Sequence, residues 1–377
     1  MPKVSRVGID GDALRKPLSG VGQYVFNLCR ELDQLLPETE FFIYTRLAPE
    51  QLALPASRWQ VRRERVAVAR KIPSFLWLKT RGVALASKDK LDVFWAGRTI
   101  HPGLKAAGHI AITVHDLNHR LVPKTMERAT RYSHQLWFEQ DVRSAHTVFS
   151  NSQGTSERLA HWAGRGADVV VHPGINRHFR PFSVSEQQAA IPELAKLGIK
   201  PPYILAVSTL EPRKNMAVLI DAFVQLKAAG ELTQHQLVLV GARGWQNQAL
   251  GQKIQNHQSL GIILPGYVPD ELMPSVFALA KVLVMPSLYE GFGMPVVEAR
   301  AVHTPVIIAD MPELKEAAAG QGQVIQPDVS GIKAALLATL VNPNNQSAVQ
   351  QDTAPSSWQD SAKQMVAALS QHQPLRE

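Results

Sequence analysis

The stretch Pro286-Ser-Leu-Tyr-Glu290-Gly-Phe-Gly-Met-Pro295-Val-Val-Glu298 carries the clearest structural signal in the chain. The apolar residues 282–285 before it predict a buried strand, and Pro295 suits the first turn of a following helix, where a backbone N–H is not needed. Gly291 and Gly293 let the loop backbone approach a ligand closely. Because N–H groups at a helix start bind phosphates or sugar hydroxyls, we expect a ligand site here, at the carboxyl edge of a parallel sheet.

Short β-rich runs alternate with helical patterns on both sides of this stretch, which predicts an α/β fold with parallel sheets. With 377 residues, the chain is long enough for two domains, each with its own core. The pattern weakens between Pro173 and Pro202, and we expect the interdomain linker there. Strands are expected at residues 4–10, 41–44, 92–95, 110–114, 147–150 and 169–171 in the first half, and at 203–208, 236–240, 262–264, 282–285, 306–309 and 323–325 in the second.

Composition and charge narrow the class of protein. Hydrophobic residues make up 45% of the chain and charged residues 19%, which is typical of a globular protein and argues against disorder. The single cysteine, Cys29, excludes an internal disulfide, and we interpret it as a core residue in a reducing, cytosolic compartment. No apolar run reaches the length of a signal peptide or of a membrane span. The net charge of +8 favours an anionic partner. The candidates are a phosphorylated substrate, an anionic membrane and nucleic acid, and composition does not choose among them.

A second group of polar residues, Ser208-Thr-Leu-Glu-Pro-Arg213-Lys214-Asn215, ends the strand expected at 203–208. A helical pattern begins directly after it, and Asn215 is expected to cap that helix. Arg213 and Lys214 would then stand beside the positive end of the helix dipole. Positive charges gathered at such a position attract an anion, and a diphosphate is the natural one.

Glu290 and Glu298 resemble the E-x7-E signature of the retaining GT-B glycosyltransferases, and the sequence Glu-Gly-Phe-Gly-Met-Pro that begins at Glu290 resembles glycosyltransferase family 4. The resemblance covers nearly the whole chain and is strongest from Tyr203 to Glu316. It implies an α/β fold in which two Rossmann-like domains face each other across a cleft (GT-B architecture). The expected parts are an acceptor-side domain at 1–180, a nucleotide-sugar-binding domain at 181–357, and a C-terminal helix at 358–377 that crosses back to the first domain.

The resemblance also implies roles for individual residues. Glu290 and the loop after it would contact the donor sugar, Glu298 would bind the ribose hydroxyls, and Lys214 would bind the donor diphosphate. Many family members carry an arginine where this chain has Thr209, and Arg213 is the candidate to supply that charge instead. The expected catalytic residues are Arg213, Lys214, Glu290 and His115, and the expected substrate-binding residues are Gly20, Gly22, Gly291, Phe292, Gly293, Met294 and Glu298.

Three features of the first domain bear on the site. Gly20 and Gly22 open the first helix, and the family has a similar Gly-x-Gly loop near the donor phosphate and acceptor; tight strand–helix packing is the alternative. His115 follows the strand expected at 110–114 and should face the cleft, where the family often has a histidine near the donor sugar. Asp10-Gly-Asp12 matches the D-x-D metal motif of another glycosyltransferase class. We expect it to structure the first loop instead, and we expect no metal ion and no other cofactor.

Residues 61–90 form a basic stretch that contains only two acidic residues, Glu64 and Asp89, and several interleaved apolar and aromatic residues. Two interpretations stay open. The stretch is either a membrane-surface patch or docking site for an anionic acceptor, or a solvated basic face beside an ordinary core. The nine basic residues are Arg62, Arg63, Arg65, Arg70, Lys71, Lys79, Arg81, Lys88 and Lys90.

The resemblance therefore implies a retaining, metal-independent glycosyltransferase. It would move a hexose, with mannose from GDP-mannose ranked first, to a glycan or lipid-linked acceptor in the assembly of a bacterial surface polysaccharide such as lipopolysaccharide. Arg213 and Lys214 would stabilise the charge that develops on the leaving diphosphate. The expected location is the cytoplasm, with or without peripheral contact to the inner face of the cell membrane.

Two other functions are alternatives. One is a nucleotide-sugar 2-epimerase, which shares the fold, but the sequence has no clear set of groups poised for elimination. The other is a basic nucleic-acid-binding protein, for which the chain has no recognisable module. We therefore expect no nucleic-acid partner.

Overall fold

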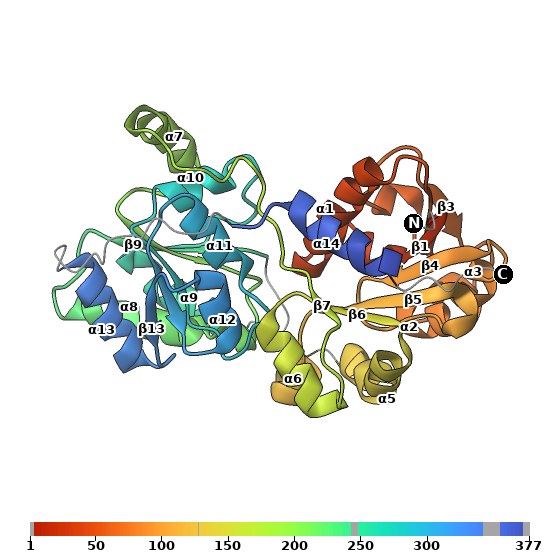
Figure 1. The fold of residues 1–377 in the computed structure, drawn as a ribbon. Helices are drawn as coiled ribbons and strands as arrows, with labels where there is room; N and C mark the ends of the chain where they lie inside the picture. The colour runs from red at the N-terminus through yellow and green to blue at the C-terminus, as the bar shows by residue number, and fades with distance from the viewer. Residues whose placement is uncertain (1–3, 127, 243–247, 342–354, 372–377) are drawn as a thin grey trace. The chain divides into compact units, whose positions relative to one another are not determined.

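The computed structural model describes residues 4–126, 128–242, 248–341 and 355–371. The chain forms two compact units (Figure 1), which we call unit 1 (residues 1–174 and 356–377) and unit 2 (residues 175–355). The chain passes into unit 2 directly after Gly174 and returns to unit 1 at Ser356, whereas the sequence predicted boundaries at 180 and 357.

Unit 1 is built on a seven-stranded parallel sheet with the strand order β3-β2-β1-β4-β5-β6-β7. The order reverses between β1 and β4, because the earlier strands lie on one side of this pair and the later strands on the other. Doubly wound sheets bind ligands at such a switch point, outside the carboxyl ends of the strands. The strands are β1 (Arg6–Asp10), β2 (Glu40–Thr45), β3 (Gln60–Arg63), β4 (Leu91–Ala96), β5 (Ala107–Val114), β6 (Thr147–Ser150) and β7 (Val169–Val170).

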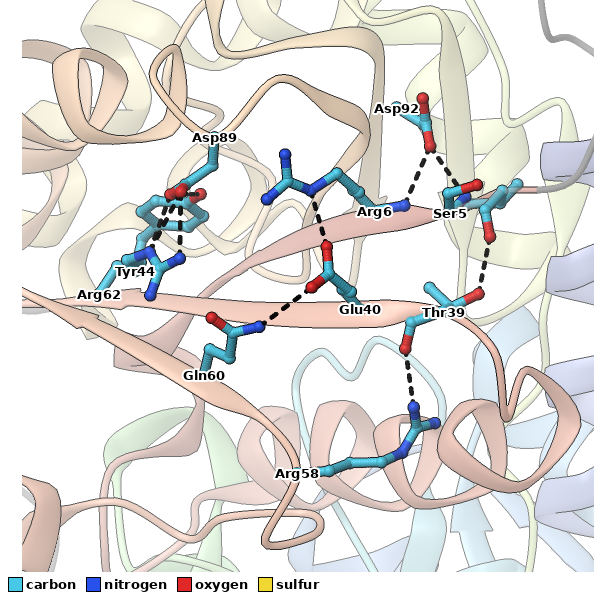
Figure 2. Close-up of polar contacts among 11 residues, drawn as sticks. Ser5, Arg6, Thr39, Glu40, Tyr44, Arg58, Gln60, Arg62, Asp89 and Asp92 are labelled. Atoms are coloured by element: carbon cyan, nitrogen blue, oxygen red, sulfur yellow. Dashed lines mark hydrogen bonds and ion pairs between the residues drawn. The ribbon is translucent and has the colours of Figure 1, made fainter.

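The strand β3 was not predicted, because its residues Gln60-Val-Arg-Arg lack an apolar alternation. It is an edge strand, and charged side chains are typical of sheet edges. Polar contacts tie this edge together (Figure 2). The Nε atom of Arg6 on β1 lies 3.0 Å from Glu40 on β2, and Asp89 accepts hydrogen bonds from Arg62 on β3 and from the hydroxyl of Tyr44 on β2.

Helices cover both faces of the unit 1 sheet. On one face lies α1, which begins after Ser19. The hydroxyl of Ser19 accepts a hydrogen bond of 3.1 Å from the backbone N–H of Gly22. Cys29 of this helix is fully buried, as predicted. Residues of α2, α5 and α6 form the core on the other face. The helices of unit 1 are α1 (Gly20–Leu35), α2 (Ser74–Trp77), α3 (Val83–Ala86), α4 (Asn118–Leu121), α5 (Arg128–Ser144), α6 (Gln153–Ala163) and α14 (Trp358–Gln371).

The C-terminal helix α14 packs against α1 within unit 1 (Figure 1). Its first residue, Trp358, meets the ring of Tyr24 edge-on, with ring centroids 5.9 Å apart. The hydroxyl of Ser361 donates a hydrogen bond of 2.6 Å to the carbonyl of His172. One turn later Met365 is buried. The C-terminal helix α14 is therefore part of the core of unit 1, together with α1 near the N-terminus.

Unit 2 is built on a six-stranded parallel sheet with the order β10-β9-β8-β11-β12-β13. Its switch point lies between β8 and β11, which are hydrogen-bonded neighbours. The strands are β8 (Tyr203–Val207), β9 (Gln236–Val240), β10 (Ile262–Ile263), β11 (Val282–Met285), β12 (Val306–Ala309) and β13 (Gln323–Ile325).

Two helical layers also cover the unit 2 sheet. Side chains of α8, α9 and α13 form the core on one face, and those of α7, α10, α11 and α12 form it on the other. The segment that the sequence suggested as a linker contains α7, whose Leu194 is fully buried in unit 2. The helices are α7 (Val184–Lys196), α8 (Met216–Ala228), α9 (Gln248–His257), α10 (Met273–Ala278), α11 (Met294–Ala301), α12 (Pro312–Ala318) and α13 (Val329–Leu340). No helix among the described residues has the length and apolar character needed to cross a membrane.

Candidate active site

The switch point of unit 2 brings together two of the predicted polar groups. Arg213 and Lys214 lie in a short 3-10 helix after β8, and Glu290 lies in the loop after β11. The two loops are joined through their backbones, because the N–H of Leu288 donates a hydrogen bond of 2.7 Å to the carbonyl of Arg213. The groups predicted from separate parts of the sequence therefore form one cluster at the carboxyl edge of the sheet.

Glu290 is the centre of this cluster. The Nζ atom of Lys214 lies 2.6 and 2.7 Å from its two carboxylate oxygens, and Nη1 of Arg213 lies 2.9 Å from Oε2. The hydroxyl of Ser287 donates a further hydrogen bond of 2.7 Å to Oε1. Glu211 binds the other side of the Arg213 guanidinium, at 2.7 Å from Nε. Lys214 and Glu290 are both buried.

The charges in this cluster determine its protonation. Burial alone would raise the pKa of Glu290, but the positive charges of Lys214 and Arg213 outweigh it and lower that pKa to about 2. Burial lowers the pKa of Lys214, and the Glu290 carboxylate offsets part of that effect. Glu290 is therefore ionised at neutral pH, and two cations face two carboxylates. A diphosphate that binds Lys214 and Arg213 has to compete with Glu290 for their hydrogen bonds.

The expectation that the Asn215 side chain caps the following helix is wrong. Asn215 precedes α8, but its side chain makes no capping hydrogen bond to that helix. Its backbone is in the left-handed region, with φ 59°. The side-chain Nδ2 instead donates hydrogen bonds to the carbonyls of Pro286, at 3.1 Å, and Pro327, at 2.8 Å. These two prolines follow β11 and β13, so Asn215 connects three loops at the carboxyl edge.

The glycine loop leads into α11 as the sequence predicted, with Pro295 in the first turn. Gly293 has φ 116°, and a Cβ atom there would lie 2.6 Å from Cδ2 of Leu314, so only glycine fits. Phe292 is buried in the core of unit 2, and Met294 packs partly against that core. The Phe292 side chain is thus part of the core, and its expected contact with the donor sugar stays a prediction.

Glu298 lies one turn into α11. Burial, together with the negative charge of Asp270, raises its pKa to about 7. Within the part of the chain that the structure describes, Glu298 makes no hydrogen bond or ion pair. Its carboxyl group is thus separate from the Glu290 cluster and has acceptor capacity for a ligand hydroxyl.

His115 and the two N-terminal glycines lie in unit 1. His115 follows β5 and is buried; burial lowers its pKa, so the ring is neutral. Its Nε2 donates a hydrogen bond of 2.7 Å to the carbonyl of Gly97, which leaves Nδ1 as a hydrogen-bond acceptor. A Cβ on Gly22 would lie 3.0 Å from the carbonyl oxygen of Ala13, which fits the packing interpretation, whereas a Cβ on Gly20 would meet nothing within 4 Å.

The Asp10-Gly-Asp12 sequence lies at the switch point of unit 1. Asp10 accepts hydrogen bonds of 2.9 and 2.7 Å from Nε and Nη2 of Arg98, which follows β4. Asp12 pairs with Arg46 at 3.2 Å, and its backbone N–H donates to Asp10. The two carboxylates are thus engaged by arginines that join the first loop to neighbouring strands.

Comparisons with known proteins bear on the fold and on the class of enzyme. The family model of glycosyl transferases group 1 matches residues 188–353, which contain the whole Glu290 cluster. O-antigen chain mannosyltransferase B of Escherichia coli is 28% identical to this chain over 344 residues, which are 87% of this chain and 89% of that protein. Sucrose-phosphate synthase from Thermosynechococcus elongatus shares the fold at 20% identity, with a TM-score of 0.75 and coverage of 97% of this chain and 98% of that one. Anabaena HepE in complex with UDP and glucose shares it at 17% identity, with a TM-score of 0.73 and coverage of 97% and 100%.

The protein is a GT-B glycosyltransferase that resembles family 4.

Several side chains of the candidate site, or of the switch point of unit 1, had no role in the sequence interpretation. Ser287 and Glu211 directly contact Glu290 and Arg213, and Arg98 holds Asp10. Ser287 follows β11 by two residues and Arg98 follows β4 by two, so their place after a strand was the available signal. Their partners come from other strands, and the sequence alone does not pair them.

The basic stretch of the glycosyltransferase is partly neutralised within unit 1. Arg62 pairs with Asp89, Arg81 with Glu64, and Lys79 with Asp141. Arg70 donates to the backbone carbonyls of Glu64 and Arg65. Other members of the stretch are exposed, namely Arg65, Lys71, Lys88 and Lys90, as are the apolar side chains of Val66, Val68 and Leu76.

Proposed function

We propose that this glycosyltransferase transfers mannose from GDP-mannose to a glycan or lipid-linked acceptor, with retention of anomeric configuration and without a metal ion, in the assembly of a surface polysaccharide. The observation that carries the proposal is the pair of cations at the switch point of unit 2, the buried Lys214 and the partly buried Arg213. Nucleotide phosphates bind doubly wound sheets at this edge. Fixed cations there are suited to a diphosphate leaving group.

The chemistry follows from where charge develops. The bond between the anomeric carbon and the β-phosphate oxygen breaks, and that oxygen keeps the electron pair. Lys214 and Arg213 stabilise the new negative charge. The acceptor hydroxyl oxygen forms the new bond to the anomeric carbon and gives its proton to the leaving phosphate on the same face, which retains the configuration. Glu290 holds the two cations ready before the donor binds, and its carboxylate then becomes available to the sugar hydroxyls.

The identities of sugar and nucleotide rest on the related proteins. The Escherichia coli relative is named as an O-antigen chain mannosyltransferase and aligns over most of both chains. Its name supports mannose as the transferred sugar and a surface polysaccharide as the product. HepE, which was solved with UDP and glucose, supports a nucleoside diphosphate as the carrier. Glu298 has free acceptor capacity for the ribose hydroxyls of such a carrier.

A donor screen tests the proposal. Release of nucleoside diphosphate is measured with GDP-mannose, UDP-glucose, dTDP-glucose and ADP-glucose, with and without a mannose-containing acceptor. We expect the highest kcat/KM with GDP-mannose, and NMR of the product should show the α configuration of the donor. Turnover with another donor and not with GDP-mannose would refute the donor assignment, and a β-linked product would refute retention.

We also propose that the enzyme contacts an anionic membrane surface through residues 65–71. Val66 and Val68 are 48% and 76% exposed and are flanked by the exposed Arg65 and Lys71. Attraction between such charges and anionic lipids fades over a Debye length of roughly 8 Å at physiological salt. Sedimentation with anionic vesicles should therefore be strong at low salt and weak at high salt. Equal sedimentation with neutral vesicles would overturn this proposal.

A further inference from the structure

Asn215 joins the lysine of the site to the loops around it. It follows Lys214 directly, and its Nδ2 donates hydrogen bonds to the carbonyls of Pro286, at 3.1 Å, and Pro327, at 2.8 Å. Pro286 begins the loop that carries Ser287 and Glu290. The position of Lys214 relative to Glu290 is therefore determined by this carboxamide as well as by the ion pair itself.

The local backbone explains why the residue is asparagine. Asn215 has φ 59° and ψ 29°, a left-handed conformation that asparagine and glycine adopt more readily than other residues. The carboxamide offers two N–H donors, and each can be directed at one carbonyl. Glycine would fit the backbone but donate nothing, and aspartate would place a carboxylate against two carbonyl oxygens. Of these three, only asparagine satisfies both the backbone and the two carbonyls.

We propose that Asn215 is a positioning residue that holds the Lys214 ammonium where it can bind the donor diphosphate. The proposal rests on the proposed function, because it takes Lys214 as the diphosphate ligand. The pair of hydrogen bonds fixes the turn between β8 and α8 against the loops after β11 and β13. Without them, the Lys214 side chain remains tied to Glu290, but the turn that carries it loses its two anchors to the neighbouring loops.

Binding of nucleoside diphosphates tests this proposal without requiring turnover. GDP, UDP, dTDP and ADP are titrated into the full-length protein by calorimetry, and the tightest of them is used for the variants. Asn215→Gly keeps the left-handed backbone accessible and adds no charge. We expect it to weaken binding about tenfold, which lies within the range for residues of one hydrogen-bond network.

A matched control lies at the opposite edge of the same sheet. The side chain of Gln236, at the start of β9, donates to the carbonyl of Gly198 and accepts from the N–H of Lys200, so it also ties a strand to a loop through a carboxamide. Gln236→Ala should leave diphosphate affinity unchanged. If Gln236→Ala weakens binding as much as Asn215→Gly, a general loss of structure explains both, and the positioning role is wrong.

A double-mutant cycle separates positioning from stability. If Asn215 acts through Lys214, Asn215→Gly should cause little further loss of affinity in the Lys214→Ala background. Equal losses in both backgrounds would overturn the proposal, as would wild-type affinity in Asn215→Gly. Failure of the wild-type protein to bind any of the four nucleotides would instead overturn the proposed function, and with it the diphosphate site that Asn215 serves.

Discussion

Lys214 is the residue on which the proposed chemistry depends most. A hydrogen bond to a charged group contributes about 1.5–3 kcal/mol, and each 1.4 kcal/mol of transition-state stabilisation is about a factor of ten in rate. Lys214→Ala should therefore lower kcat/KM by roughly one to two orders of magnitude. Because the lysine acts on charge that develops during transfer, we expect the loss mainly in kcat, as steady-state kinetics with varied donor will measure.

The control for this variant is another lysine of unit 2. Lys253 on α9 forms an ion pair with Asp221 at 2.6 Å, outside the Glu290 cluster. Lys253→Ala removes the same charge and should retain wild-type kinetics. Wild-type activity in Lys214→Ala, or an equal loss in both variants, would show that the anion site has been misplaced.

Glu298 should make both stability and donor binding depend on pH. Its pKa is raised from 4.5 to about 7 by burial and by Asp270, so the folded protein keeps this proton at pH values where the unfolded chain has released it. The resulting stabilisation is fully present below pH 4.5 and is lost as the pH rises through about 7. Glu298→Gln should therefore raise the melting temperature relative to wild type at pH 8 but not at pH 4.5.

The same titration should affect donor binding. The ionised carboxylate is the better acceptor for ribose hydroxyls, so the wild-type KM for the donor should fall as the pH rises from 6 to 8. In Glu298→Gln the KM should be higher and flat over this interval. A melting-temperature difference that is the same at both pH values, together with an unchanged pH profile of KM, would show that Glu298 does not titrate in this range.

At the residue scale, the sequence predicted which groups gather but not how they pair. Lys214, Arg213 and Glu290 each follow a strand, and strands of a parallel sheet end at the same edge. Their meeting could therefore be expected. Which carboxylate accepts from which cation depends on loop conformations that no local pattern encodes. For the same reason Asn215 was expected to cap a helix, while its left-handed backbone directs the side chain to Pro286 and Pro327.

At the scale of elements, the packing of α14 on α1 is the clearest test of how unit 1 is held together. Met365 is 1% exposed at the centre of the α14 face. Replacing a buried methionine by alanine typically costs about 2–5 kcal/mol. Met365→Ala should therefore lower the free energy of opening of the α1 and α14 amides by a comparable amount, which is measured as faster hydrogen exchange. The exchange rates of unit 2 amides should stay unchanged.

The control variant for this helix is the neighbouring Gln364→Ala, which alters an exposed side chain of the same turn. Its exchange rates should match those of the wild type. Unchanged protection of α1 in Met365→Ala would mean that α14 contributes little to the stability of unit 1.

The strands were the most predictable elements, since those buried on both faces read as continuous apolar runs. The predicted strands at 147–150, 236–240, 282–285, 306–309 and 323–325 match β6, β9, β11, β12 and β13 residue for residue. Among the described residues, the strand that the sequence analysis missed is β3, which lies at an edge and is stabilised by charged contacts such as Arg62 with Asp89. Its stabilising partners lie on other segments, so the local sequence could not reveal it.

At the scale of the whole molecule, the two sheets repeat one arrangement with different chemistry at each switch point. In unit 1 the carboxylates of Asp10 and Asp12 are bound by Arg98 and Arg46, and in unit 2 Glu290 is bound by Lys214 and Arg213. The α/β class and the division into two sheets followed from the alternating pattern. The linker expected between Pro173 and Pro202 did not, because α7 has the punctuated sequence of a linker, including an internal proline, yet buries Leu194 in unit 2.

In the proposed mechanism, fixed cations of unit 2 replace a metal ion in transfer from a nucleotide sugar. The most direct measurement is the rate of transfer from GDP-mannose in the presence of saturating EDTA. We expect a rate close to that without EDTA. Abolition of transfer by EDTA, with recovery on addition of Mn²⁺, would contradict it and return Asp10-Gly-Asp12 to consideration as a metal site.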